Sequence, residues 1–189
     1  MIFQEIIVDT DICLKIGKVE HQNFLELLVP FLAEKIYIHR YVYEEIVWPQ
    51  EVKDQIHRLI SKGTLLMIDQ HALDPIESIL YRQSVAKLEA IMIHPKFPLR
   101  HRGEIHSLAM AKARSIPIFA TDEQKLQPKV DRILNTGIGG FNIQCVGIPE
   151  ILKNFATKDQ IDLSRDDAKA IWLSSGRNEL SFNQVIWPN

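Results

Sequence analysis

The chain has 189 residues, and its 46% hydrophobic content is enough to build the core of one ordinary domain. With 22 basic and 24 acidic side chains, the net charge of -2 gives no global attraction for polyanions, so nucleic-acid binding would need a local basic patch or bridging metal ions. Cys13 and Cys145 show no CxxC spacing and no stretch approaches the ~18 apolar residues of a membrane span, so we expect a reduced, cytoplasmic protein without a membrane segment.

The first half of the chain alternates short aliphatic strands with helices. The aliphatic runs predict strands at residues 6–8, 35–39 and 64–69. Helical spacing predicts helices at residues 12–17, 23–34, 41–47 and 52–61, with Pro30 bending or ending the second and Gly63 ending the last. Asp74, Pro75 and Glu77 carry the signature of a capping box for a helix that runs to about residue 92.

The second half continues this alternation and adds a tail. After a loop at 94–103, we expect an Ala-rich helix at 103–115, a strand in IPIFA, a strand at 142–147 and a short helix at 149–155. In the tail, Ser164 and Asp167 predict the start of a helix that Gly176 stops, followed by an edge strand in ELSFNQVIW. We therefore predict one domain at 1–155 and a C-terminal extension at 156–189 that packs on the domain or on a partner.

Strands that alternate with helices predict an α/β fold with a mostly parallel central sheet. In such sheets ligands bind at the carboxyl ends of strands, where the strand order reverses. Asp9 and Asp122 each come directly after an aliphatic strand. Both carboxylates are therefore expected to project into that crevice.

Two further acids are candidates by their context. In YVYEEIVWP, Glu44 and Glu45 lie on adjacent faces of a short helix, so that one points inward and the other is solvated. Glu104 occupies the first turn of the Ala-rich helix, where the helix dipole alone would also favour a carboxylate. Carboxylates brought together repel one another unless divalent cations such as Mg²⁺ or Mn²⁺ join them. Such a cluster is typical of metal-assisted phosphodiester hydrolysis.

The order of these motifs resembles the PIN domain family of nucleases, which includes the toxins of toxin-antitoxin pairs. The matching segments are IIVDTD with Asp9, VYEEI with Glu45, RGEIHSLAMAKA with Glu104 and IFATDE with Asp122. The Gly-Glu pair is similar to one branch of the family, in which it replaces the commoner Asp. The resemblance covers about residues 5–152.

This resemblance implies a three-layer fold with helices on both faces of a sheet of about five strands, and hydrolysis of single-stranded RNA by water. Asp9, Glu45, Glu104 and Asp122 would hold Mg²⁺ or Mn²⁺, while Thr121 would orient carboxylates. An antitoxin protein and a homodimer are the expected protein partners.

Other charged residues are candidates for the site, and each of them could instead be an ordinary solvent-exposed residue. Asp11 and Glu123 either extend the acidic cluster or face solvent. Arg100, Arg102 and Lys125 either bind substrate phosphates or belong to solvated loops. Trp48, Trp172 and Trp187 are better explained as core or interface residues than as base-stacking platforms.

Two other functions compete with a metal-dependent ribonuclease. One is a PIN-like binding or regulatory module without turnover, although such a protein has little reason to keep a self-repelling cluster of acids. The other is a haloacid-dehalogenase-like phosphatase, because IIVDTDIC also fits a DxD pattern in which Asp9 is the nucleophile and Asp11 the general acid. That reading leaves the motifs around Glu45 and Glu104 unexplained.

Overall fold

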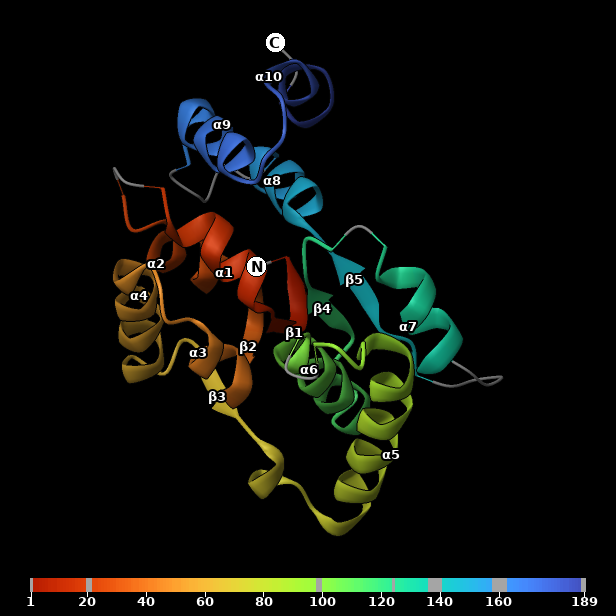
Figure 1. Ribbon diagram of the computed structural model, residues 1–189. Coiled ribbons are helices and arrows are strands. Elements are labelled where there is room, and N and C mark those ends of the chain that lie inside the picture. Colours follow the sequence, from red (N-terminus) through yellow and green to blue (C-terminus); the bar gives the residue numbers. More distant parts are fainter. Residues whose placement is uncertain are drawn as a thin grey trace.

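A central sheet of five parallel strands organises the computed structural model, which describes residues 2–19, 22–97, 100–123, 125–135, 141–157 and 163–187 (Figure 1). The strand order is β3-β2-β1-β4-β5. The strands are β1 (Phe3–Val8), β2 (Ala33–His39), β3 (Leu66–Ile68), β4 (Ile118–Ala120) and β5 (Gln144–Val146). The prediction of an α/β fold with a parallel sheet flanked by helices is therefore confirmed.

The strand order reverses at the centre of the sheet, between β1 and β4. From β1 the chain first adds β2 and β3 on one side, and then returns to add β4 and β5 on the other. Val8 pairs with Ile38 of β2 and with Ala120 of β4, so these three strands end at the same edge. Residues that follow directly, such as Asp9 and Thr121, therefore meet at the switch point where ligands bind in this class of sheet.

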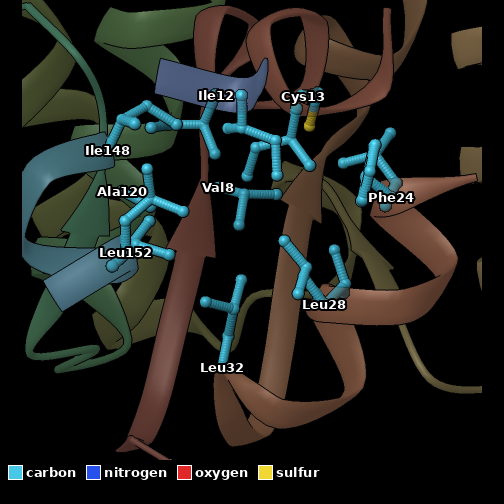
Figure 2. Packing of buried hydrophobic residues seen from close by; sticks show 14 of the residues in the cluster. Val8, Ile12, Cys13, Phe24, Leu28, Leu32, Ala120, Ile148 and Leu152 are labelled. Atoms are coloured by element: carbon cyan, nitrogen blue, oxygen red, sulfur yellow. The ribbon is translucent and has the colours of Figure 1, made fainter. Parts of the chain in front are cut away.

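Successive residues of β1 point to opposite faces of the sheet, and each face is covered by its own helices. Ile6 and Val8 belong to one buried cluster and Ile7 to the other. The first cluster is shared with α1 (Thr10–Gly17), α2 (Phe24–Leu28), α4 (Gln50–Ser61), α8 (Ile148–Ala156) and α9 (Arg165–Ser174), and Figure 2 shows part of its packing. The second is shared with α5 (Pro75–Met92), α6 (Arg102–Ala113) and α7 (Gln127–Ile133).

Short elements complete the chain. The helix α3 (Arg40–Glu45) follows β2 and packs against α6 and β2. Two 3-10 turns, η1 (Val29–Phe31) and η2 (Gln70–Ala72), precede β2 and α5. The tail ends in α10 (Glu179–Ser181), which continues as the π-helical turn η3 (Phe182–Ile186). No described helix combines the length and the apolar character that crossing a membrane requires.

Several local signals in the sequence are confirmed. Asp74 accepts hydrogen bonds from the backbone N–H groups of Ile76 and Glu77, and Glu77 completes the capping box of α5. Ser164 accepts a 3.1 Å hydrogen bond from the N–H of Asp167 at the start of α9. Gly63 and Gly176 adopt φ values of +70° and +83° after α4 and α9, a conformation that side chains disfavour.

Three expectations were wrong or incomplete. The helix expected at 23–34 ends at Leu28, continues as a 3-10 turn containing Pro30 and gives way to β2 at Ala33. The expected edge strand at 179–187 is helical instead. Phe182 and Ile186 are buried while Gln184 between them is exposed, which is a helical pattern, because a strand would turn residues 182, 184 and 186 to the same face. The helix α7 was not anticipated.

The described part of the C-terminal extension packs on the domain. Ile171 and Trp172 of α9 and Phe182 of η3 belong to the same buried cluster as Ile12 of α1 and Ile151 of α8. The Oγ of Ser174 also donates a 2.7 Å hydrogen bond to the carbonyl of Lys15. In Figure 1 the blue segment accordingly lies beside α8, at the end of the sheet where β1 and β4 stop.

Candidate functional site

The site is built where β1 and β4 end. The N–H of Asp9 donates to the carbonyl of Ala120 at 3.0 Å, and the N–H of Thr121 donates to the carbonyl of Val146 at 2.9 Å, so the sheet ladder continues to this edge. Asp9 also precedes α1 as its N-cap residue. The Thr121 hydroxyl donates to Oδ2 of Asp9 at 3.4 Å, consistent with the carboxylate-orienting role expected for it.

Several acids converge on one cavity of about 240 Å³, which we call the acidic pocket. Its lining comes from the β1–α1 turn, α3, the start of α6 and the turn after β4: Asp9, Thr10, Asp11, Leu14, Glu45, His101, Glu104 and Glu123. Three of the four principal acids expected from the sequence are therefore brought together. Asp11 and Glu123 lie with them, and Glu44 is exposed and outside this lining.

Glu45 is held at the pocket by two hydrogen bonds. Its Oε1 accepts from the N–H of Gly103 at 2.8 Å, and its Oε2 accepts from the Thr10 hydroxyl at 3.1 Å. A Cβ on residue 103 would overlap Oε2 of Glu45 and lie 3.1 Å from Cγ2 of Val42. The glycine before Glu104 is thus the residue that allows α6 to approach the Glu45 carboxylate.

Glu104 is buried, and only one of its two carboxylate oxygens has a hydrogen-bond partner among the described residues. Its Oε2 lies 2.7 Å from Nδ1 of His101, which occupies a left-handed backbone conformation with φ of 64° just before α6. Its Oε1 is buried and has no hydrogen-bond partner among the described residues. Burial raises the pKa of Glu104, and the charge and hydrogen bond of His101 only partly offset that rise.

The ionised forms of Asp9 and Asp11 are destabilised in a similar way. Burial raises the pKa of Asp9 well above its usual range, and the charges of Asp11, Glu104 and Glu45 raise it further. Burial also raises the pKa of Asp11, although Lys15 lies 3.7 Å from its Oδ2. Its Oδ1 is buried without a partner in the part of the chain that the structure describes. The pocket therefore concentrates negative charge with too little compensation inside the protein.

This donor set suits a hard divalent cation, since oxygen ligands, mutual repulsion and two unpartnered buried carboxylate oxygens all favour one. Among the described residues, however, no three His, Cys, Asp or Glu side chains are placed to hold one ion together. Mg²⁺ usually keeps several waters and takes only one or two carboxylates directly. The arrangement thus fits a hydrated ion held by Asp9 and Glu104, with Asp11 and Glu45 beside it.

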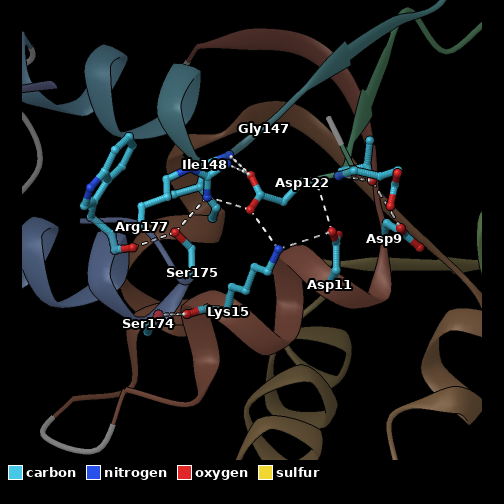
Figure 3. Close-up of polar contacts among 12 residues, drawn as sticks. Asp9, Asp11, Lys15, Asp122, Gly147, Ile148, Ser174, Ser175 and Arg177 are labelled. Atoms are coloured by element: carbon cyan, nitrogen blue, oxygen red, sulfur yellow. Dashed lines mark hydrogen bonds and ion pairs between the residues drawn. The ribbon is translucent and has the colours of Figure 1, made fainter. Parts of the chain in front are cut away.

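Asp122, the fourth expected metal ligand, is engaged elsewhere (Figure 3). Arg177 binds both of its oxygens at 2.6 and 2.7 Å, and Lys15 Nζ lies 2.8 Å from Oδ2. The N–H of Ile148 donates to Oδ1 at 3.2 Å. Burial raises the pKa of Asp122, but the hydrogen bonds from Arg177 and Lys15 outweigh it and hold that pKa below its usual value. Asp122 lines neighbouring cavities rather than the acidic pocket.

Arg177 and Lys15 were missed by sequence reasoning. Arg177 is 55 residues from Asp122 and Lys15 is 107 residues from it, so no local motif links either cation to the acid. Lys15 does lie four residues after Asp11 on α1, a spacing that places the two on one helix face. That spacing was the only signal in the sequence.

The three expected phosphate-binding residues are separated. Lys125 lines a cavity of about 430 Å³ together with Lys15, Asp122, Glu123 and Arg177. The guanidinium of Arg102 lies 5.8 Å from the centre of the Tyr41 ring, and Arg100 is exposed. Neither Arg100 nor Arg102 contributes to the lining of the acidic pocket.

A neutral aromatic network braces the helices that carry Glu45 and Glu104. The Tyr81 hydroxyl lies 2.6 Å from Nδ1 of His106 and 3.5 Å from Nε2 of His39, and the N–H of Tyr41 donates to Nδ1 of His39 at 3.1 Å. The Tyr41 ring stacks on His106 with centres 4.3 Å apart. Burial lowers the pKa of His39 to about 3 and that of His106 to about 4, so both are neutral at physiological pH.

The three tryptophans occupy different environments. Trp172 is buried and Trp187 packs against the same cluster, as expected. Trp48 is 76% exposed, so it is not a core residue, and its role as an interface residue stays a prediction.

The resemblance to PIN domains rests on four short motifs, each of which carries an acid after a strand or at a helix. The chain was compared with protein-family models, with curated proteins and with solved structures, and no match was found in any of the three comparisons.

Proposed function

We propose that this protein is a Mg²⁺- or Mn²⁺-dependent ribonuclease that hydrolyses phosphodiester bonds of single-stranded RNA, in the manner of a toxin from a toxin-antitoxin pair. The observation that carries the proposal is the group of undercompensated carboxylates at the switch point of the sheet, in which Asp9 and Glu104 are buried and Asp11 is half-buried. A protein gains nothing in stability from such a group, so the cost points to a cation as its ligand.

The bound ion would supply an activated water and stabilise the charge that develops on the phosphate oxygens. Asp9 and Glu104 would hold it, with Thr121 orienting Asp9 and His101 orienting Glu104. Glu123 is exposed at the mouth of the acidic pocket, where it can accept the proton from the attacking water. Lys125, on the same turn, lines the neighbouring cavity and would contact a substrate phosphate.

Cleavage of a random-sequence pool of single-stranded RNA tests the proposal, because a pool avoids the choice of one wrong substrate. We expect Mn²⁺-dependent cleavage that EDTA abolishes and that Asp9→Asn reduces by about 100-fold or more, the scale of a lost catalytic group. Glu45→Gln should also lose activity, whereas Glu44→Gln, which changes a neighbour outside the acidic pocket, should not. Cleavage that survives both EDTA and Asp9→Asn would rule out the proposed mechanism.

A binding module without turnover is the second candidate, and one observation favours it. The pairing of Asp122 with Arg177 and Lys15 removes one of the four expected ligands from the acidic pocket. Retention of the RNA pool without cleavage in Mn²⁺, by folded protein, would support this candidate. The phosphatase alternative fits less well, because Lys15 pairs with Asp122 and not with Asp9, its expected nucleophile.

A further inference from the structure

Arg177 is held by its own segment so that its guanidinium faces Asp122. Besides the two hydrogen bonds to Asp122, its Nη1 donates to the Ser175 hydroxyl at 2.7 Å, and its Cζ lies 5.1 Å from the centre of the Trp172 ring. A paired, two-bond contact between Arg and a carboxylate is the strongest form of such an ion pair. The guanidinium is thus positioned by α9 and the turn that follows it, as Figure 3 shows.

Arg177 and two further donors together use all of the hydrogen-bonding capacity of Asp122. Arg177, Lys15 and the N–H of Ile148 together donate four hydrogen bonds to its two oxygens, and only 2% of its side chain is exposed. A carboxylate offers about four acceptor positions. A divalent metal ion could therefore bind Asp122 only after Arg177 or Lys15 had left it. While both side chains remain, their positive charges repel the metal ion.

The segment that carries Arg177 has a fixed base and a small tip. Its base is apolar, since Ile171, Trp172 and Phe182 are buried in the cluster that they share with α1 and α8. Its tip is the turn of Ser175, Gly176 and Arg177, where even a Cβ added to Gly176 would have no atom within 4 Å. The long side chain of Arg177 can therefore rotate away from Asp122 at this tip while the apolar base stays packed.

We propose that the segment 163–187 is a latch that keeps Asp122 from binding the metal ion, because the guanidinium of Arg177 occupies the carboxylate of Asp122 in place of that ion. This inference rests on the proposed function, because it assumes that the acidic pocket takes a metal. Release of Arg177 frees an acid that β4 places one residue from Thr121, which already contacts Asp9. Metal affinity is then set by competition between the ion and the guanidinium.

Calorimetric titration of Mn²⁺ into the full chain tests the latch. Arg177→Gln should bind Mn²⁺ about tenfold more tightly than the unaltered protein. Arg165→Gln is the matched control, because Arg165 lies on the same segment but bonds to Asn183 and not to Asp122, and it should leave the affinity unchanged. Adding Asp122→Asn to Arg177→Gln should remove the gain. Thermal unfolding of each variant shows whether it is folded.

The outcomes separate the latch from the metal site itself. Mn²⁺ binding that Asp9→Asn weakens but folded Arg177→Gln does not strengthen would overturn the latch and leave the proposed function standing. An absence of Mn²⁺ binding in every folded variant would overturn both. If Arg177→Gln does not fold, Ser175→Ala replaces it: loss of the Ser175 support should loosen Arg177 and raise the affinity by a smaller factor. An unchanged affinity in folded Ser175→Ala would then count against the latch.

Discussion

Asp9 is a buried acid with no ion-pair partner in the described part of the chain, and three other acids contribute to its electrostatic environment. The Thr121 hydroxyl and the start of α1 are its only evident support. In the absence of a metal, the ionised form of Asp9 therefore opposes folding. This gives a direct prediction for the protein in EDTA.

Replacing Asp9 with asparagine should stabilise the metal-free protein at neutral pH, because the ionised carboxylate of Asp9 is buried beside Asp11, Glu104 and Glu45. Because the pKa of Asp9 is raised in the folded state, that state holds a proton that the unfolded chain releases above about pH 4. Stability of the unaltered protein should thus fall as pH rises from there, and Asp9→Asn should lack this fall. Chemical denaturation at several pH values measures the difference.

An Asp9→Asn variant that is less stable than the unaltered protein at pH 7 in EDTA would contradict this picture. Excess Mn²⁺ should reverse the order, since only the unaltered carboxylate gains a cation. At pH values below about 4 the two proteins should converge, because Asp9 is then protonated in both states.

The contact between α3 and α6 depends on Gly103. Substitution to alanine would place a Cβ in the position of the Glu45 carboxylate and break its hydrogen bond to the Gly103 N–H. We expect Gly103→Ala to weaken Mn²⁺ binding by about tenfold, the scale of a lost outer contact in a metal site, because the Glu45 carboxylate beside the ion loses its support. The double variant with Glu45→Gln should be no weaker than Glu45→Gln alone. Additive losses would show that Gly103 acts by some other route.

The network of His39, Tyr81 and His106 joins the end of β2 to α5 and α6, and it requires neutral histidines. Their pKa values are lowered by burial, so the unfolded chain binds protons below about pH 6.5 that the folded chain refuses until about pH 4. Stability should fall as pH falls through this window. His106→Phe should reduce the slope by up to ~1.4 kcal/mol per pH unit.

The same variant should cost about 1 kcal/mol at pH 7, because the Tyr81 hydroxyl loses its closest partner. Adding Tyr81→Phe should recover part of this loss by removing the orphaned hydroxyl. Equal slopes in His106→Phe and the unaltered protein would mean that His106 does not titrate in this way.

Elements with strong local signals were predictable from the sequence. The capping residues of α5 and α9 and the aliphatic runs of β1 and β2 are such signals, because they act within one turn or one strand. Two elements lacked them. The helix α7 is short, has no capping hydrogen bond from a side chain and buries only Val130 and Ile133. At residues 182–186, the apolar side chains of Phe182, Val185 and Ile186 suit a strand as well as a helix, and packing of Phe182 and Ile186 on the core decided between them.

The site was predictable in part for a similar reason. Asp9 follows β1, Glu45 ends the helix after β2, and Glu104 lies in the first turn of α6, the helix that leads back to β4. Topology therefore brings these three acids to the carboxyl edge of the parallel sheet. The pairing of Asp122 with Arg177 does not follow from the sheet topology, because Arg177 reaches Asp122 through the packing of the C-terminal segment on α1 and α8. Contacts of this kind depend on tertiary structure, which no spacing in the chain records.

The overall architecture places a charged crevice between two halves of the chain. Residues before about 70 build β1, β2 and β3 with α1 and α3, and later residues add β4, β5 and α6 on the other side of β1. The acidic pocket is lined by residues from both parts. The C-terminal segment contacts Asp122, next to this pocket, through Arg177. The central claim is that this pocket binds a divalent metal ion.

Anomalous scattering from crystals soaked in Mn²⁺ tests that claim most directly. We expect a peak in the acidic pocket, within about 2–2.5 Å of a carboxylate oxygen of Asp9 or Glu104, which are bonding distances for such ions. It also predicts that Asp9→Asn crystals show no peak there. A pocket that stays empty at saturating Mn²⁺, or an ion bound only at other acids, would contradict the account.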